Sequence, residues 1–433
     1  MKKALKVIAL ILALAMVVAF AACAGKTEPT TEPAGNETAD TTAEGTEDTT
    51  ADAEAADLSK IKFGLICLHD ENSTYDNNFI MAAKEAQAAL GLSDDQVVIK
   101  TNVDESNACY EAACDLVELG CNVIMADSFG HESYMKQAAQ EYPDVQFCHA
   151  TGTSSKSAGI ANFHNAFATI YEGRFLAGVV AGLKLNAMIE AGDITAEQAV
   201  IGYVGAFPYA EVKSGYTSFF LGARYICPSA TMKVVYTNSW FDIDLEKTAA
   251  ENLINDGCVL ISQHADSEGA PKACEAANVP NVAYNIDTSS IAPNTALVSS
   301  RINWAPYYEM VIKAVAAGET FATDWIGTIA TGSVELLDLS ANCTEDAAAK
   351  VAEVKAKLED GSLKVFDCST FTVKGENLTE YTADVVDEGD FVPETNVIVT
   401  DEATGITYFA ESDEQFRSAP YFDIIIDGIT ELG

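Results

Sequence analysis

Several short stretches of this chain combine aromatic side chains with small polar ones, and each stretch follows a run of apolar residues. An aromatic ring stacks on another flat π-system, while carboxyl, amide and hydroxyl groups can bind the donors and acceptors on its edge. The pattern therefore favours a binding site for a planar heterocycle. The stretches are Asn72-Ser-Thr-Tyr75, Asp127-Ser-Phe-Gly130, Ala206-Phe-Pro208, Asn238-Ser-Trp-Phe-Asp242, Gln263-His-Ala-Asp266 and Asn285-Ile-Asp287.

The apolar runs in front of these stretches alternate with helical patterns. The sequence predicts strands at 61–68, 96–100, 122–126 and 145–148, and helices at 78–90, 108–119 and 133–142. This alternation, with continuously apolar strands, indicates a parallel sheet covered by helices on both faces.

A second α/β unit is predicted to begin near Asn162. It starts with a long helix at 166–189, which carries Gly173, Gly178 and Gly182 on a close-packing face. Its strands are predicted at 199–205, 232–236, 259–262 and 282–284. Ligands of doubly wound sheets bind beyond the carboxyl ends of the strands, so we expect a cleft between the two units there.

The charge of the chain limits its partners. It contains 25 Lys and Arg against 65 Asp and Glu, a formal net charge of −40, and 48% of its residues are hydrophobic. Binding to nucleic acid needs basic patches, so we expect no nucleic-acid partner. An anionic ligand would also be repelled, whereas a neutral solute would not.

The N-terminus has the pattern of an export signal. Lys2, Lys3 and Lys6 precede an apolar run at 7–20, and Phe20-Ala-Ala-Cys23 ends it, as is typical of bacterial lipoprotein signals. We expect residues 1–22 to be a signal peptide, Cys23 to carry lipid and 23–57 to be a disordered acidic tether. The alternative is an ordinary cleavage site with a chance cysteine. We expect the protein on the extracytoplasmic face of the cell membrane, held by its lipid alone.

Ten further cysteines, at 67 to 368, lack any C-x-x-C spacing. Most lie in apolar runs, which favours buried free thiols, although a bridge between Cys343 and Cys368 stays open. Motifs of hydrolases, nucleotide-binding loops and zinc enzymes are absent from the sequence. We therefore expect no enzyme, no metal and no cofactor; His264 and Asp266 leave open an acid/base pair beside the ligand.

The stretches resemble the basic membrane protein family of solute-binding lipoproteins, which serve ABC importers of purine nucleosides and nucleobases. The likeness runs from about Lys60 to Ser340 and is closest to an adenine-type subgroup. The segments that carry it are Tyr171-Glu-Gly-Arg-Phe-Leu-Ala-Gly178, Gly205-Ala-Phe-Pro-Tyr-Ala-Glu-Val212, Asn238-Ser-Trp-Phe-Asp242, Gln263-His-Ala-Asp-Ser267, Tyr284-Asn-Ile-Asp287 and Asn303-Trp-Ala-Pro-Tyr-Tyr308.

The resemblance implies a two-lobed α/β type I periplasmic-binding fold, with a mostly parallel sheet flanked by helices in each lobe. Because such folds exchange segments, we expect residues 58–161 plus 288–325 in lobe one and 162–287 plus 326–433 in lobe two. It also implies a purine-type ligand, an ABC transporter permease as partner and a monomeric protein.

The resemblance assigns roles to individual residues. Tyr75 and Trp240 would form an aromatic clamp, one ring from each lobe, with Phe129 and Phe207 walling the pocket. Ser128, Asp266, Asn285 and Asp287 would read the edge of the ring. Trp304 is a further candidate contact, or the start of a helix. Because Asn285 occupies an expected acidic position, a bare nucleobase is favoured over a nucleoside.

Three alternatives remain at this point. The protein could present its ligand to a signalling partner as a sensor. It could instead process nucleosides as a hydrolase or phosphorylase, or act as a surface adhesin on its tether.

Overall fold

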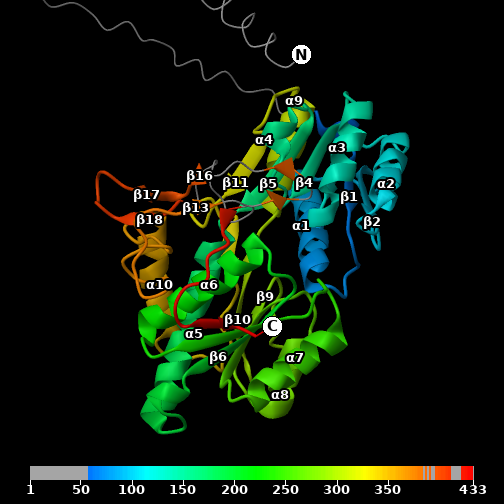
Figure 1. The fold of residues 1–433 in the computed structure, drawn as a ribbon. Helices are drawn as coiled ribbons and strands as arrows, with labels where there is room; N and C mark the ends of the chain where they lie inside the picture. The colour runs from blue at the N-terminus through cyan, green and yellow to red at the C-terminus, as the bar shows by residue number, and fades with distance from the viewer. Residues whose placement is uncertain (1–56, 384–385, 388–389, 392–394, 411–420, 433) are drawn as a thin grey trace, which may run out of the picture. The chain divides into compact units, whose positions relative to one another are not determined.

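The computed structural model of the chain describes residues 57–383, 386–387, 390–391, 395–410 and 421–432 (Figure 1). They belong to one compact unit that runs from Ala55 to Gly433. The predicted signal at 1–22, Cys23 and the predicted tether up to residue 56 lie outside the described residues. Within the described part, every helix is too short or too polar to cross a bilayer.

The first sheet has six described strands, all parallel, in the order β11-β5-β4-β3-β1-β2. The continuously apolar β1 and β3 are buried on both faces, as expected of a parallel sheet between two helical layers. The strands are β1 (Phe63–Ile66), β2 (Val97–Lys100), β3 (Val123–Ala126), β4 (Gln146–Ala150), β5 (Phe163–Ala168) and β11 (Asp324–Gly327).

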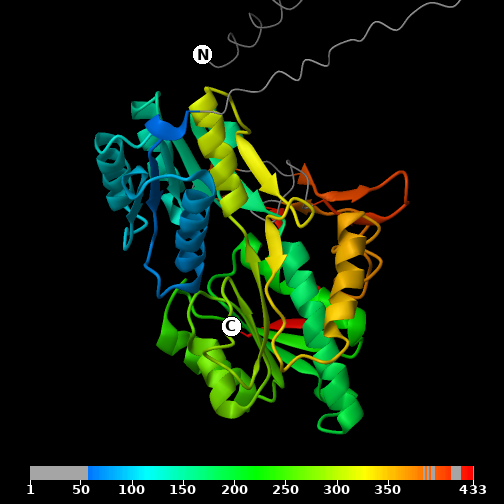
Figure 2. The ribbon, with the colours of Figure 1, turned by 180° about the vertical axis from the view of Figure 1, so that it is seen from behind.

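Helices cover both faces of this sheet, and Figure 2 shows the yellow helix α9 beside its strands. One face packs against α2 and α3 through Ile66, Ile124 and Phe147. The other packs against α1 and α9, where the rings of Phe63 and Tyr308 lie 4.9 Å apart. The helices of this first lobe are α1 (Thr74–Leu90), α2 (Asn107–Glu118), α3 (Glu132–Glu141), α4 (Ser155–Ala158) and α9 (Ala305–Ala317).

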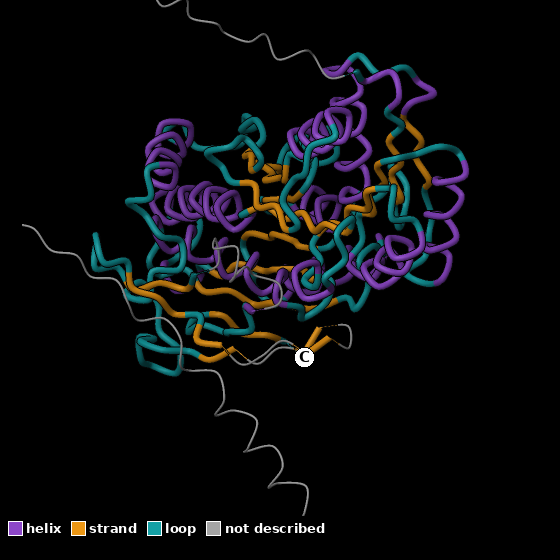
Figure 3. The backbone as a smooth tube through the Cα atoms, turned by 90° about the horizontal axis from the view of Figure 1, so that it is seen from above, coloured by secondary structure: helices purple, strands orange, loops and turns teal. Residues whose placement is uncertain are grey.

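The second sheet has seven described strands in the order β12-β10-β9-β8-β6-β7-β19, and β12 alone is antiparallel to its neighbour. Figure 3 shows the strands of the chain in orange with helices in purple around them. The strands are β6 (Val200–Gly205), β7 (Thr231–Tyr236), β8 (Leu260–His264), β9 (Asn281–Tyr284), β10 (Ala296–Ile302), β12 (Val334–Leu336) and β19 (Ile429–Glu431).

The helices of the second lobe divide between the two faces of this sheet. Val204 and Ile261 pack against α7 and α8, whereas Tyr203 and Leu260 face the core shared with α5 and α6. The helices are α5 (Ile170–Ala191), α6 (Ala210–Ile226), α7 (Ile243–Asn255), α8 (Gly269–Ala277) and α10 (Ala347–Glu359). The prediction of a two-lobed α/β fold with mostly parallel sheets is confirmed.

Helices α5 and α6 touch backbone to backbone. A Cβ on Gly178 would lie 2.0 Å from the carbonyl oxygen of Phe219, and one on Gly182 would lie 2.5 Å from that of Ala223. Neither position has room for a side chain. The predicted close-packing face is thus confirmed at these two glycines.

The strand order corrects two of the predicted assignments. β5 pairs with β4 in the first sheet, although its residues were predicted in lobe two, partly as the start of the long helix. A short buried strand running into an apolar helix cannot be separated from it by periodicity. β10 pairs with β9 in the second sheet, although 288–325 was predicted in lobe one. The chain therefore crosses between lobes after β5, after β10 and again between β11 and β12.

The last part of the described chain packs on the second lobe. β19 pairs with β7 at the sheet edge, and the ring of Phe366 lies 5.4 Å from Tyr171 and 4.8 Å from Phe422. The remaining described strands form small antiparallel pairs: β13 (Thr382–Ala383) with β16 (Thr395–Asn396), β14 (Val386–Asp387) with β15 (Asp390–Phe391), and β17 (Ile398–Thr400) with β18 (Thr407–Phe409).

All ten cysteines of the described part are free thiols, as predicted. The sulfur of Cys343 donates to the carbonyl oxygen of Leu297 at 3.2 Å, and that of Cys368 donates to Phe366 at 3.8 Å. The alternative bridge between these two cysteines is therefore not formed.

Candidate ligand-binding site

A pocket lies where the carboxyl ends of the strands in the two lobes meet. It holds about 410 Å³ of space not filled by atoms, part of it open to solvent. Loops after β1, β3 and β4 and the start of α1 supply the first-lobe wall, and segments after β6, β7 and β8 supply the second. The lining residues are Leu68, His69, Tyr75, Asp76, Ser128, Phe129, Thr151, Glu211, Trp240, His264, Asp266 and Tyr284.

Tyr75 is held at the pocket by the start of α1. Ser73 caps this helix by accepting a hydrogen bond from the backbone of Asp76, which fixes the first turn. The hydroxyl of Tyr75 donates to the carbonyl oxygen of Asp127 at 2.8 Å, and its ring lies 4.9 Å from Phe79. The ring is thereby fixed at both ends.

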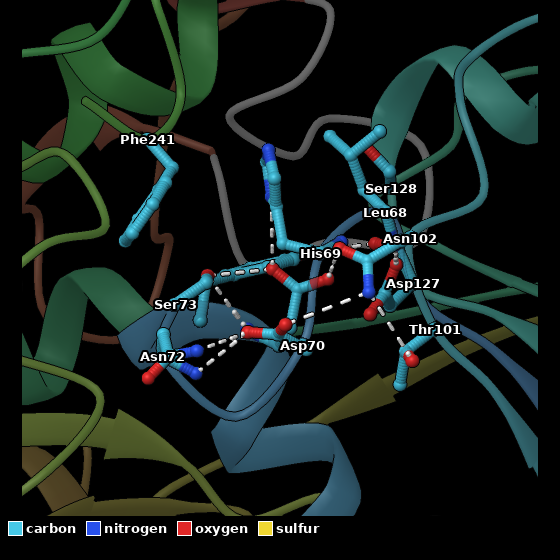
Figure 4. Close-up of polar contacts among 12 residues, drawn as sticks. Leu68, His69, Asp70, Asn72, Ser73, Thr101, Asn102, Asp127, Ser128 and Phe241 are labelled. Carbon is cyan, nitrogen blue, oxygen red and sulfur yellow. Dashed lines mark hydrogen bonds and ion pairs between the residues drawn. The ribbon is translucent and has the colours of Figure 1, made fainter.

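Asp76 is the polar centre of the first-lobe wall. Its carboxylate accepts hydrogen bonds from the backbone of His69 at 2.7 Å, from Nδ1 of His69 at 3.3 Å and from the hydroxyl of Ser73 at 2.6 Å. Burial opposes its ionisation, but the bonds from His69 and Ser73 hold the pKa of Asp76 below its ordinary value. The imidazole of His69 also faces Phe241 of the second lobe at 5.3 Å (Figure 4).

Asp127 lies behind Asp76. Its pKa is shifted in the opposite direction from that of Asp76. Its Oδ1 accepts the backbone N–H of Leu68 at 3.1 Å, while Oδ2 has no hydrogen-bond partner among the described residues (Figure 4). Burial and the nearby charge of Asp76 raise the pKa of Asp127 well above its ordinary value. Asp76 thus carries the charge and Asp127 holds its proton.

Cys67, Asp76 and Asp127 bring a thiol sulfur and two carboxyl oxygens within 4.8 Å of one another, a set that could bind a metal ion. Burial raises the pKa of the Cys67 thiol well above its ordinary value, which opposes the thiolate that a metal needs. The carboxylate of Asp76 is also engaged by His69 and Ser73. Of the three residues, Asp76 lines the pocket, whereas Cys67 and Asp127 do not.

The loop after β3 places Ser128 and Phe129 at the pocket. The hydroxyl of Ser128 and the backbone N–H of Gly130 both donate to one oxygen of Glu105, at 2.6 and 2.8 Å. This shared acceptor fixes the loop, and the ring of Phe129 reaches Tyr209 of the second lobe at 5.7 Å.

Trp240 comes from the loop that joins β7 to α7. Its ring lies 5.1 Å from Phe207 and 5.8 Å from Tyr209, so it belongs to an aromatic group at the mouth of the pocket. Asp242 ends the loop by accepting the backbone N–H groups of Asp244 and Leu245, which caps the start of α7.

Asp266 follows β8 and points a nearly buried carboxyl group at the pocket. Its backbone N–H donates to Trp240 at 2.9 Å, yet within the described chain its carboxyl group makes no hydrogen bond. Burial, and then the charges of Glu246, Asp76 and Glu211, raise the pKa of Asp266 well above its ordinary value. The carboxyl group of Asp266 is therefore free to form a hydrogen bond with a ligand.

The pocket combines four aromatic rings with three carboxyl groups. Among the lining residues there is no Lys, Arg, Asn or Gln. Such a lining suits a flat, uncharged molecule that carries N–H donors, and it disfavours an anion.

A family model for PnrA-like ABC transporter substrate-binding proteins, named Bmp, matches residues 65–364. The chain belongs to the Bmp family. Its fold and its site are therefore those of a substrate-binding protein of ABC transporters and not of an enzyme family.

Two curated relatives of this Bmp-family chain carry names with different ligands. A purine-binding protein of Brucella abortus is 32% identical over 311 residues, which cover 71% of this chain and 83% of the relative. TsgA13 of Haloferax volcanii, named for glucose binding in an ABC transporter, is 32% identical over 250 residues. That match covers 58% of this chain and 60% of TsgA13, less than two thirds of its length.

Solved structures match the fold of the Bmp-family chain. A solute-binding protein of an ABC transporter system from Aeropyrum pernix aligns with a TM-score of 0.60 at 17% identity, covering 71% of this chain and 93% of that one. One from Conexibacter woesei aligns with a TM-score of 0.58 at 18% identity, covering 70% and 98%. These matches identify the fold as that of periplasmic solute-binding proteins.

The Bmp-family pocket brings together five of the residues predicted to contact ligand. Tyr75, Ser128, Phe129, Trp240 and Asp266 line it. Their common feature is a position directly after a strand or at the first turn of the following helix.

The other four predicted residues lie elsewhere. Phe207 stands behind Trp240, and Asn285 is buried with its backbone bonded to Ser300. Asp287 is exposed and accepts hydrogen bonds from Ser289. Trp304 is 1% exposed and stacks on Phe79 at 4.5 Å, because it begins α9 inside the first-lobe core.

Sequence reasoning missed several lining residues. Asp76 follows Tyr75 directly but was not predicted to contact ligand. Tyr284, Glu211 and His264 lie in segments that carry the family resemblance, yet none of them was named as a ligand contact. Glu211 lies in the first turn of α6, after the Phe207 stretch, so its place beyond a strand end was a usable signal.

Proposed function

We propose that the protein captures a purine nucleobase or nucleoside between its lobes and delivers it to an ABC importer. The observation that carries this proposal is the lining of the pocket: aromatic rings from both lobes around carboxyl groups, without Lys or Arg among the lining residues. Membership of the Bmp family and the named purine-binding relative support it.

The aromatic residues account for affinity. Tyr75 and Phe129 come from the first lobe, and Trp240 and Tyr284 come from the second. A flat base that stacks on rings of both lobes holds the lobes together. Stacking contributes about 1–3 kcal/mol per base. A dissociation constant of about 1 µM requires about 8 kcal/mol, so the polar groups of the pocket have to supply the remainder.

The polar residues favour a purine over a sugar. Each hydroxyl of a sugar is both donor and acceptor, and amide and guanidinium groups are well suited to donate to several of them at once. The lining residues offer Asp76, Glu211 and Asp266 but no Asn, Gln, Lys or Arg. Carboxylates suit the ring and amino N–H groups of a purine.

A free base is favoured over a nucleoside. Arg301 is bound to Glu335 at 2.9 Å and does not line the pocket. Asn285 does not line the pocket either. No Lys or Arg among the lining residues is therefore available for ribose hydroxyls.

Isothermal titration calorimetry tests the ligand class. The signal-free chain should bind at least one of adenine, guanine, hypoxanthine, adenosine and guanosine, and should not bind glucose or leucine. Binding of glucose with no response to any purine would overturn the proposal. If only nucleosides bind, the purine ligand class stands and the preference for a free base is wrong.

The lipid anchor and the delivery step have a separate test. With Cys23→Ala in the full-length chain, the protein should leave the membrane fraction and incorporate no labelled palmitate. Purine uptake by the producing cells should fall while binding in vitro stays intact. If the variant stays in the membrane fraction, the proposed lipid anchor at Cys23 is wrong.

A further inference from the structure

Arg174 is a fully buried cation of α5 with no carboxylate partner in the described chain. Its Nη2 donates to the hydroxyl of Tyr203 at 2.7 Å, to the hydroxyl of Ser262 at 3.0 Å and to the carbonyl oxygen of Gln263 at 3.1 Å. A buried charge without an ion pair is costly, so it marks a group whose position serves something beyond packing.

The guanidinium sits one layer behind the pocket. Its central carbon lies 5.2 Å from the ring centre of Tyr284, a lining residue, and 5.5 Å from that of Tyr203. These rings hold the cation by the attraction of their π-faces without neutralising it.

The hydrogen bond from Arg174 to Tyr203 determines the direction of the hydrogen bond between Tyr203 and His264. Arginine can only donate, so the hydroxyl oxygen of Tyr203 accepts from it and must use its own proton elsewhere. Nδ1 of His264 lies 3.5 Å from that oxygen. Tyr203 therefore donates to Nδ1, which leaves the proton of a neutral His264 on Nε2.

The chain of hydrogen bonds ends on a carboxyl group of the pocket. Nε2 of His264 lies 3.4 Å from Oε1 of Glu211, and with its proton on Nε2 it donates to that oxygen. Oε2 of Glu211 has no hydrogen bond from any residue that the structure describes. Distances of this length are common in sites without ligand and shorten when the ligand binds.

The imidazole has little freedom to turn. A Cβ on Gly215 of α6 would lie 2.5 Å from Nδ1, so the ring fills the space that this glycine leaves. The ring centres of His264 and Tyr284 lie 4.9 Å apart on the other side. The orientation that accepts from Tyr203 is thus fixed by packing as well as by hydrogen bonds.

We propose that Arg174 is a positioning residue, which acts through Tyr203 and His264 to hold Glu211 as a fixed hydrogen-bond acceptor for an N–H group of the ligand. The ligand part rests on the proposed function, but the order of the hydrogen bonds does not. Asp266, the other second-lobe carboxyl group of the pocket, has no such chain of hydrogen bonds behind it among the described residues, and burial raises its pKa well above its ordinary value.

The test removes one hydroxyl and keeps every ring. Tyr203→Phe cuts the chain between Arg174 and His264, while Tyr216→Phe is the matched control. Tyr216 is an equally buried neighbour, 5.7 Å from Tyr203 between ring centres, and its hydroxyl binds Glu431 outside the pocket. Unfolding temperatures of both variants confirm that the fold is retained.

Nitrogen-15 NMR of the histidine rings without ligand reads the tautomer, and His264→Gln identifies the signal. We expect the Nε2–H form in the wild type and in Tyr216→Phe, and a mixture of tautomers in Tyr203→Phe. An Nδ1–H form or a doubly protonated ring in the wild type at pH 7 would overturn the proposal, as would an unchanged tautomer in Tyr203→Phe.

Ligand titration completes the test. Tyr203→Phe should weaken purine binding about fivefold to tenfold, the effect of one net hydrogen bond, and Tyr216→Phe should change it less than twofold. If Tyr203→Phe binds purine as tightly as the wild type, Arg174 does not act on ligand binding. If no purine binds the wild type, the proposed function fails, while the tautomer result still judges the hydrogen-bond chain.

Discussion

The backbone N–H of Thr74 donates a 2.8 Å hydrogen bond to the carbonyl oxygen of Asp266, which joins α1 of the first lobe to the loop after β8 of the second. Next to it, Phe129 meets Tyr209 across the pocket at 5.7 Å. The two lobes thus touch around the site through these contacts. Ligand that binds both walls favours the closed arrangement.

Trp240→Ala should weaken purine binding by about tenfold or more, because the base loses one stacked face worth about 1–3 kcal/mol. The fold should persist, since Trp240 is only half-buried. Calorimetry of the purified variant measures the change. Trp325→Ala is the control, because Trp325 packs on Tyr307 in the first lobe and does not line the pocket. Equal losses in both variants would take Trp240 out of the site.

Trp304→Ala should act on stability instead of on binding. The side chain is 1% exposed and stacks on Phe79, so its removal leaves a large cavity in the first lobe. We expect the free energy of unfolding to fall by about 3–5 kcal/mol in urea titrations. Affinity of the folded variant should stay within a factor of two of the wild type. A loss of affinity with unchanged stability would return Trp304 to the ligand contacts.

Asp266→Asn should change how stability depends on pH. Burial and neighbouring carboxylates raise the pKa of Asp266 above its ordinary value of 3.8, so the folded state holds this proton more tightly than the unfolded state. The contribution of Asp266 to the free energy of unfolding therefore falls as pH rises above about 4, by about 1.4 kcal/mol per pH unit until the raised pKa is reached.

Asparagine cannot titrate, so the variant should gain stability relative to the wild type as pH increases. Urea unfolding without ligand at several pH values from 4 to 7 measures the difference. Asp287→Asn, at an exposed position outside the pocket, is the control. A stability difference that is the same at every pH would show that Asp266 ionises normally.

Gly178→Ala should destabilise the second lobe. The added methyl carbon would lie 2.0 Å from the carbonyl oxygen of Phe219, so α5 and α6 would have to separate. We expect a loss of about 3 kcal/mol in the free energy of unfolding. Gly91→Ala is a useful comparison, because that glycine has open space and only a left-handed φ of 67°, which costs about 1–2 kcal/mol. A smaller loss at Gly178 than at Gly91 would contradict the close contact.

The sequence was sufficient to predict two mostly parallel sheets, but not their strands β5, β10, β11, β12 and β19 or the path of the chain between the sheets. Continuous apolar runs marked β1, β3, β6 and β8, because strands buried on both faces need apolar side chains at every position. The same property hid β5, whose residues run on into the apolar start of α5. Which sheet receives β10 depends on pairing with β9, a contact between segments that local patterns do not encode.

The candidate site could also be predicted only in part from the sequence. Residues directly after strands, such as Trp240 and Asp266, could be placed because parallel strands bring their ends to one edge. Asn285 also follows a strand, but a left-handed φ of 71° and a hydrogen bond to Ser300 hold its backbone apart from the pocket. Glu211 was missed because its role depends on His264, which is distant in sequence and meets it only after folding.

The pairing of β19 with β7 ties the biogenesis of the protein to its final residues. The first sheet needs β11 at 324–327 and the second needs β19 at 429–431, so neither is complete until most of the chain has left the ribosome. Pairings this distant in sequence form slowly. Proteolytic clipping of the last few residues would bare the edge of β7 and leave it open to aggregation.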